Sequence, residues 1–154
     1  MTKFSTLNKT QILQACLSLL NQKQKGLQAA IRQIQDSMLN ETKSSSGDKH
    51  ETARAKMQSE QASLGDQLLE IEKQISVLTK IDPSSTSTQV QTGAIIQTPN
   101  ALFFMALGLG KVLIDNTVIF VISPASPLGQ KMMGAQAGQS IQLNNNNYLI
   151  EKIS

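Results

Sequence analysis

Two acidic residues, Asp48 and Glu51, have the type and spacing that best fit chemistry in this chain of 154 residues. They stand three apart after a polar, turn-forming stretch, and this spacing places both on one face of a helix. Carboxylate oxygens are the ligands that Mg²⁺ prefers, although two acids leave most of its octahedral shell to a partner. Helix capping is the other explanation, because Asp and Glu are favoured at helix N-termini. Spacing alone leaves both open.

Basic residues surround the acidic pair and favour contacts with phosphates beside it. A solvated helix end is the better explanation for any single one of them. His50, between the two acids, is a candidate proton shuttle or cap, although a lone exposed histidine more often has no such role. The basic residues are Lys43, Lys49, Arg54 and Lys56.

Composition excludes several classes of protein. A single cysteine, Cys16, and a single histidine rule out a disulfide framework within the chain and any Cys/His metal cluster. Aromatic residues make up 3% of the chain, too few for a base-stacking surface. The net charge of +3 arises within the first 80 residues without a basic stripe, so we expect no independent sequence-specific DNA binding. No apolar run approaches membrane-spanning length and no signal peptide is visible, so we expect a cytoplasmic protein without membrane contact.

Apolar residues in the first half follow two heptad seams, one from Leu13 to Met38 and one from Met57 to Leu78. Gln24 and Gln61 are the only interruptions. Such seams predict two helices that pair along a narrow stripe. Pairs such as Leu27 with Leu64 keep a constant sum of residue numbers, as an antiparallel hairpin requires. The sequence therefore predicts a coiled-coil hairpin over residues 1–81, with its tip near 44–51.

The second half has a different composition. All four prolines and most glycines follow residue 81, and residues 82–89 form a polar linker that cannot continue a helix. Residues 90–154 predict an antiparallel or mixed sheet with one short helix, giving an α+β protein overall. The expected strands are 90–98, 101–107, 112–114, 118–122, 140–143 and 148–152, with a turn at 144–147 and a helix from Pro127 to Met133.

Two stretches resemble the Gre-type transcript cleavage factors. Residues 47–53 (Gly-Asp-Lys-His-Glu-Thr-Ala), Glu60 and residues 71–82 are similar to the coiled-coil tip and second helix of that family. Residues 90–94 and 122–138 resemble its C-terminal, FKBP-like domain. The resemblance covers about residues 8–154 and is most specific from Ser126 to Gly138.

This resemblance implies an elongation factor whose partner is bacterial RNA polymerase. Such a factor inserts its hairpin into the secondary channel, where Asp48 and Glu51 would help to hold a catalytic Mg²⁺ shared with the polymerase, which then cleaves backtracked RNA near its 3′ end. The factor alone would be neither a nuclease nor a tight Mg²⁺ binder. Its C-terminal domain would dock at the channel rim through a region that contains Ser123, Ser126, Pro127, Leu128, Gly129 and Gly134.

The chain departs from the family pattern at the tip, where Lys49-His50 replaces a commoner Leu-Lys and Thr52 replaces Asn. A factor that occupies the channel and modulates or inhibits transcription without cleavage is therefore the second hypothesis. A peptide-binding FKBP-like module with a coiled-coil spacer is the third. It requires an aromatic-lined pocket in residues 90–154, and the scarcity of aromatic residues there disfavours it.

Overall fold

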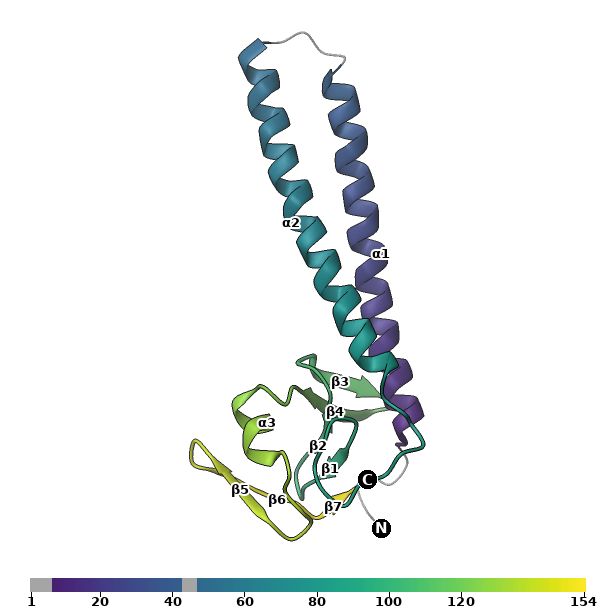
Figure 1. Ribbon diagram of the computed structural model, residues 1–154, viewed down its shortest axis with the longest axis vertical. Helices are drawn as coiled ribbons and strands as arrows, with labels where there is room; N and C mark the ends of the chain where they lie inside the picture. Colours follow the sequence, from purple (N-terminus) through teal and green to yellow (C-terminus); the bar gives the residue numbers. More distant parts are fainter. Residues whose placement is uncertain (1–6, 43–46) are drawn as a thin grey trace. The chain divides into compact units, whose positions relative to one another are not determined.

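The computed structural model describes residues 7–42 and 47–154, and at 41, 42 and 47–50 it describes the backbone but not the side chains. Two long helices precede a mixed sheet, a two-stranded ribbon and one short helix (Figure 1). This architecture confirms the predicted α+β class. The elements are α1 Lys9–Thr42, α2 Gly47–Thr79, β1 Ile95–Gln97, β2 Leu102–Met105, β3 Gly110–Ile114, β4 Thr117–Ile122, α3 Pro127–Met132, β5 Ser140–Leu143, β6 Asn146–Leu149 and β7 Lys152–Ile153.

Packing divides the chain into two units. Unit 1 extends to Ser18 and resumes at Ser76, so it holds the first turns of α1, the end of α2 and all the strands. Unit 2 is Leu19–Ile75, the remainder of the two long helices. No helix in the described part of the chain is long and apolar enough to cross a membrane.

Local hydrogen bonds explain where α1 begins. The Asn8 side chain accepts a hydrogen bond from the backbone N–H of Gln11 at 2.9 Å, and the Gln11 side chain accepts one from the N–H of Asn8 at 3.0 Å. This reciprocal pair is a capping box, which satisfies donors that a helix start leaves unpaired. The helix that follows is 34 residues long.

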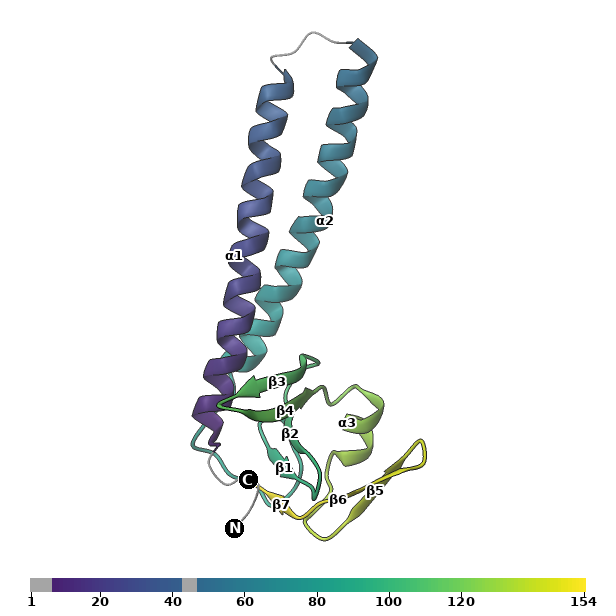
Figure 2. The ribbon, with the colours of Figure 1, turned by 180° about the vertical axis from the view of Figure 1, so that it is seen from behind.

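Within unit 2 the two helices run side by side in opposite directions (Figures 1 and 2). Seam residues such as Leu27 and Ile71 are half-buried, while most of their neighbours are exposed. One groove between the helices brings Leu27 together with Ile71 rather than with its predicted partner Leu64. Offsetting the predicted pairing by four residues fits this groove better, since that register gives every apolar seam residue except Leu13 a partner, with each seam glutamine facing an isoleucine.

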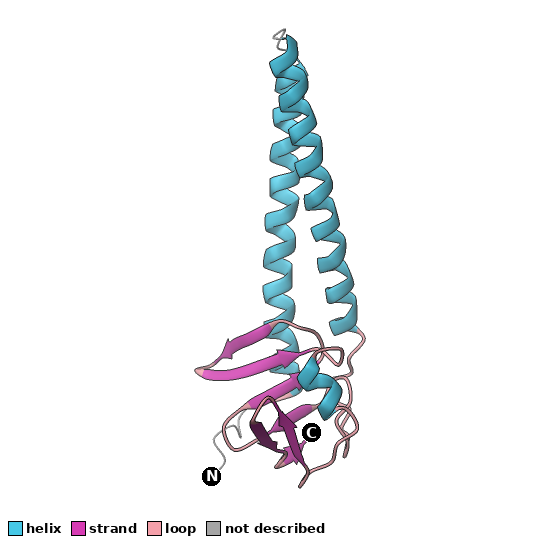
Figure 3. Ribbon diagram, turned by 90° about the vertical axis from the view of Figure 1, so that its left-hand side faces the viewer, coloured by secondary structure: helices cyan, strands magenta, loops and turns pink. Residues whose placement is uncertain are grey.

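The sheet of unit 1 has the strand order β3-β4-β2-β1-β7. Strands β2 and β4 pair in parallel, with Phe103 opposite Phe120, and the other neighbours are antiparallel. Strands β5 and β6 form a separate antiparallel ribbon. Figure 3 shows the strands in magenta and the short helix α3 in cyan.

Several predicted boundaries were wrong by a few residues; the expected strand 101–107, for example, is only Leu102–Met105. Three larger differences have a local reason. Only Ile95–Gln97 of the expected strand 90–98 is a strand, because Gly93 has a φ of +94° and Val90 bonds outside the sheet. The expected turn 144–147 is shorter, since Asn144 and Asn145 alone adopt positive φ and β6 begins at once. The expected strand 148–152 splits into β6 and β7, which pair with different strands.

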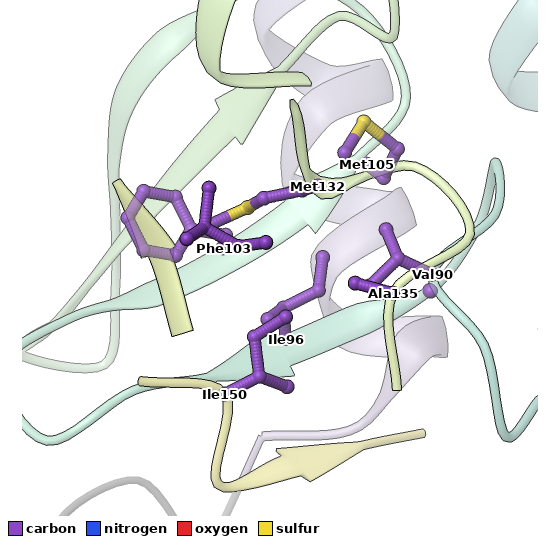
Figure 4. Packing of buried hydrophobic residues seen from close by; sticks show 9 residues of the cluster. Val90, Ile96, Phe103, Met105, Met132, Ala135 and Ile150 are labelled. Atoms are coloured by element: carbon purple, nitrogen blue, oxygen red, sulfur yellow. The ribbon is translucent and has the colours of Figure 1, made fainter. Parts of the chain in front are cut away.

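Both faces of the central strands are buried. On one face, Ile96, Phe103 and Met105 pack with Met132 of α3 and with Ile150 (Figure 4). On the other face, Phe104, Ile119 and Val121 are also buried. The fully buried residues of the two long helices within unit 1 are Ile12, Cys16 and Leu78. We infer that the helix ends cover this second face, because otherwise its apolar side chains would contact water.

A buried lysine joins the start of α1 to the segment after α2. The Lys9 side chain is 6% exposed, and its Nζ donates a hydrogen bond to the carbonyl oxygen of Ser85 at 2.6 Å. Burial lowers the pKa of Lys9, and the charge of Asp82 partly opposes this effect. The hydroxyl and backbone N–H of Ser84 donate to Asp82, which lowers the pKa of that carboxyl.

We expect the stability of unit 1 to rise with pH just below 10.5, the ordinary pKa of Lys9. The folded chain releases this proton at lower pH than the unfolded chain does. The unfolded chain therefore binds more protons in that range, and its formation becomes less favourable as pH rises. Lys9→Met should remove this component, which cannot exceed about 1.4 kcal/mol per pH unit. The test is urea denaturation of the native protein, Lys9→Met and the exposed control Lys80→Met between about pH 8 and 10. Parallel plots of the free energy of unfolding against pH for all three proteins would refute this prediction.

Candidate functional site at the start of the second helix

The acidic pair lies at the N-terminus of α2. This helix begins at Gly47, so Asp48 is in its first turn and Glu51 follows in the next. The backbone is helical through both positions, and a separation of three residues places them on one helix face. The Glu51 side chain is exposed, and that of Asp48 lies outside the described part of the structure. The helical backbone at this pair agrees with the expectation, and its chemical role stays a prediction.

The four basic residues are not equivalent. Lys56 is exposed, Lys43 lies outside the described residues, and the side chain of Lys49 is likewise not described, nor is that of His50. Arg54 is half-buried and lines a groove of about 380 Å³ with Met38 and three other residues. An arginine suits this position because its methylene groups can cover apolar surface while the guanidinium remains solvated. Arg54 therefore has a packing role beside its predicted phosphate contact. The other residues of the groove are Gln35, Leu39 and Gln61 of the two helices.

The donor atoms of the acidic pair suit a hard cation, and a metal shared with a partner stays a prediction. Among the side chains that the structure describes, no three from His, Cys, Asp and Glu are grouped to hold a metal ion. Asp48 and Glu51 offer the hard oxygen donors that Mg²⁺ prefers, and Glu51 presents its carboxylate to solvent. Most of the remaining ligands of an octahedral ion would have to come from elsewhere.

The loop before α3 contains much of the predicted docking region, and hydrogen bonds fix its shape. The Ser126 hydroxyl donates to the carbonyl oxygen of Ser123 at 2.7 Å and accepts from the backbone N–H of Gly129 at 3.0 Å, which caps α3. The Ser123 hydroxyl accepts from the N–H of Ala125 at 3.0 Å. A Cβ on Gly129 would lie 1.9 Å from the Ser123 carbonyl oxygen. Only glycine therefore fits there.

The other residues of this region also have structural roles. Exposed Pro127 is the first residue of α3, where its missing N–H is no loss. Leu128 packs against the core. Gly134 has a φ of +81°, and its N–H donates to the Val90 carbonyl at 2.8 Å. These residues are explained by the fold, and docking through them stays a prediction. The exposed side chains in this stretch, such as Gln130 and Lys131, were not singled out from the sequence.

One hollow of the β-rich part bears on the peptide-binding hypothesis. It measures about 280 Å³ and is lined by eight residues, of which Tyr148 supplies the one aromatic ring. Three asparagines contribute amide groups. Phe103 packs against Phe120 and Tyr148, with ring centroids 5.7 and 5.9 Å apart, so these rings contribute to the core. A polar lining of this kind does not match the apolar pocket that peptide binding would require.

The chain matches no protein-family model, and no curated protein matches it. Two solved structures are similar to it in fold. GreA factor homolog 1 (Gfh1) of Thermus thermophilus is 18% identical, with 90% of this chain and 94% of that chain covered and a TM-score of 0.35. A structure described as the transcription factor Gfh1 is 16% identical, with 90% and 93% covered and a TM-score of 0.36. These values are too low to carry a functional argument.

Sequence reasoning missed Lys9, whose burial depends on a residue far along the chain. The Asn-x-x-Gln signature of the capping box was visible at residues 8–11, and it would have placed Lys9 at the first helical position. A positive charge is unfavourable at that end of a helix. This conflict was the available signal that Lys9 has a specific partner.

Proposed function

We propose that this chain is a Gre-type elongation factor that binds RNA polymerase, inserts its helical hairpin into the secondary channel and stimulates cleavage of backtracked RNA. The observation that carries the proposal is an acidic pair on one face at the start of α2, close to the point in the chain where helices of 34 and 33 residues are joined. The sequence resemblance at residues 122–138, which lie outside the hairpin, supports it independently.

The length of the hairpin suits this role. The part of α1 in unit 2 runs from Leu19 to Thr42 and measures roughly 35 Å at 1.5 Å per residue. Half-buried apolar side chains join the two helices along this length, while polar side chains cover most of the rest of their surface. A paired, polar rod can enter a hydrated channel without exposing a broad apolar face.

The chemistry that we assign to this chain is limited to its own residues. Asp48 and Glu51 would hold Mg²⁺ together with ligands of the polymerase, and the ion would polarise the phosphate and activate a water. The negative charges of the acids raise the affinity of the assembled centre for the cation. Because the polymerase supplies the active site, we expect no nuclease activity from the isolated chain. The proposal places the protein in the cytoplasm with its partner.

The direct test is to add the purified protein to a backtracked elongation complex and to follow the length of the RNA. We expect shortened transcripts only when polymerase, factor and Mg²⁺ are all present. Binding to core polymerase, measured separately, tests the partner. Failure to bind would reject the proposal altogether.

The tip sequence favours a second function, a channel-binding modulator without cleavage activity. Lys49 and His50 between the acids, and Thr52 after them, differ from the family pattern. Under this alternative the protein would bind polymerase and change the elongation rate, and RNA in backtracked complexes would keep its length.

A further inference from the structure

The middle of each long helix contains a glycine that the packing does not explain. Gly26 is near the centre of α1, and Gly65 is near the centre of α2. A Cβ built on either residue would meet no atom within 4 Å, apart from its own helix and chain neighbours, and neither has a positive φ. Close approach and unusual backbone conformation are the usual reasons for glycine. Neither reason applies here.

These glycines weaken the helices where they stand. Glycine is about 1 kcal/mol less favourable than alanine in a helix interior, because it keeps more backbone freedom in the unfolded chain. Apart from Gly47 at the start of α2, Gly26 and Gly65 are the only glycines of the described residues in unit 2. In the register indicated by the groove, they lie about one turn apart along the hairpin. The two helices are therefore weakened at nearly the same level of the hairpin.

Packing between the helices is incomplete at the same level. A groove of about 500 Å³ opens beside Gly26, and its lining includes Leu27 and Ile71 of the seam. Gln24, which interrupts the first seam, is three residues, about one turn, before Leu27. The nearby seam side chains Leu27, Ile31, Leu68 and Ile71 are half-buried rather than buried. At this level of the hairpin, helix propensity and packing between the two helices stabilise the structure less than an uninterrupted seam would. The remaining residues of the groove are Lys23, Gln67, Glu70 and Gln74.

We propose that Gly26 and Gly65 form a flexible joint in the middle of the hairpin, where both helices bend or open locally. Bends in long helices have identifiable causes, and glycine is one of them. Two such points within one turn let both helices of the pair yield together. The joint lets the half of unit 2 nearest the acidic pair change direction relative to the other half. This inference stands whether or not the chain binds polymerase.

The test measures distances along each helix by pulsed electron spin resonance. Cysteines replace Gln22 and Gln33, which are exposed and flank Gly26 at a separation of eleven residues. Exposed Ala29 and Asn40 give a matched pair on α1 with the same separation and no glycine between them. The native Cys16 is buried, and burial raises the pKa of its thiol to about 11, so it competes poorly for the label. Exposed Gln58 and Leu69 serve in the same way across Gly65.

We expect broader distance distributions for the two pairs that span a glycine than for the matched pair. Gly26→Ala with Gly65→Ala should narrow them to the width of the matched pair. Amide exchange around both positions should slow about fivefold per substitution, the factor that corresponds to the helix propensity difference. Ser37→Ala with Ser59→Ala, at exposed positions of the same helices, raises propensity elsewhere and should leave both distributions broad.

Either of two results would overturn the joint. Equal widths for all pairs in the native sequence would show that the hairpin does not bend at this level. Broad distributions that persist in the double alanine variant would show that the motion has another origin. Helical content and the midpoint of thermal unfolding, measured on the same samples, establish that every variant is folded.

Discussion

Replacing Asp48 by Asn and Glu51 by Gln together should reduce stimulated RNA cleavage by at least about 100-fold. Both changes keep the size of the side chain and remove the negative charge that would attract Mg²⁺. Losing one group that stabilises developing charge in an active site typically costs about 10² to 10³ in rate. The measurement is the initial rate of RNA shortening in backtracked complexes at saturating factor.

The design separates chemistry from folding and binding. Asparagine caps helices about as well as aspartate does, so the start of α2 should persist in the double variant. Glu60→Gln with Asp66→Asn makes the same change of charge at exposed positions further along α2 and should keep full activity. Affinity for polymerase should be nearly unchanged in both. Cleavage at the unmodified rate by the Asp48 and Glu51 variant would reject the role of these acids.

Gly129→Ala should unfold the β-rich part of the protein or destabilise it by about 3–5 kcal/mol, the range of severe packing mutations. The new Cβ would lie 1.9 Å from the Ser123 carbonyl oxygen and 2.9 Å from the Ser126 hydroxyl oxygen. The first of these atoms belongs to the backbone and also accepts the hydrogen bond from Ser126, so it cannot move without breaking the cap. Helix α3 would then lose its N-terminal cap, and Met132 would lose its place in the core.

Gly108→Ala is the matched control, because no atom lies within 4 Å of a Cβ at that position and its φ is not positive. We expect it to leave stability within about 1 kcal/mol of the native protein. Fluorescence of Tyr148, the single tyrosine, reports on this part of the chain during denaturation. Equal midpoints for the two variants would show that the loop between Ser123 and Gly129 rearranges readily.

Helices were easier to predict than strands because their signal is local. The seam from Leu13 to Met38 repeats over several turns, and the sequence around residue 8 marks the helix start. The β-rich part depends on pairings between distant segments. Nothing in the side-chain pattern of Phe103 and Phe120 shows that their strands are parallel neighbours. Likewise, the bonds of Val90 to Gly134 and Ala135, which keep the beginning of the expected strand out of the sheet, link positions far apart in sequence.

The candidate site was predictable in position, and less so in the roles of its neighbours. Asp48 and Glu51 were found because a spacing of three after a turn has a direct geometric meaning on a helix. Arg54 has the same spacing from Glu51, but its environment depends on α1, since Met38 and Leu39 share its groove. The predicted docking region is the opposite case, because residues found from the sequence have structural roles there. Ser126 and Gly129 stand out in the sequence, and in the structure their contacts fix the shape of the loop before α3.

The order of the packing units along the chain makes the hairpin an insertion. Unit 1 is interrupted after Ser18 and resumes at Ser76, so its early residues, including the fully buried Ile12 and Cys16, must wait for strands translated much later. Closing this loop becomes only slightly harder as the loop lengthens, because its entropic cost grows with the logarithm of length. Evolution or design can therefore lengthen or shorten the hairpin by matched heptads in both helices while the core of unit 1 keeps all its residues.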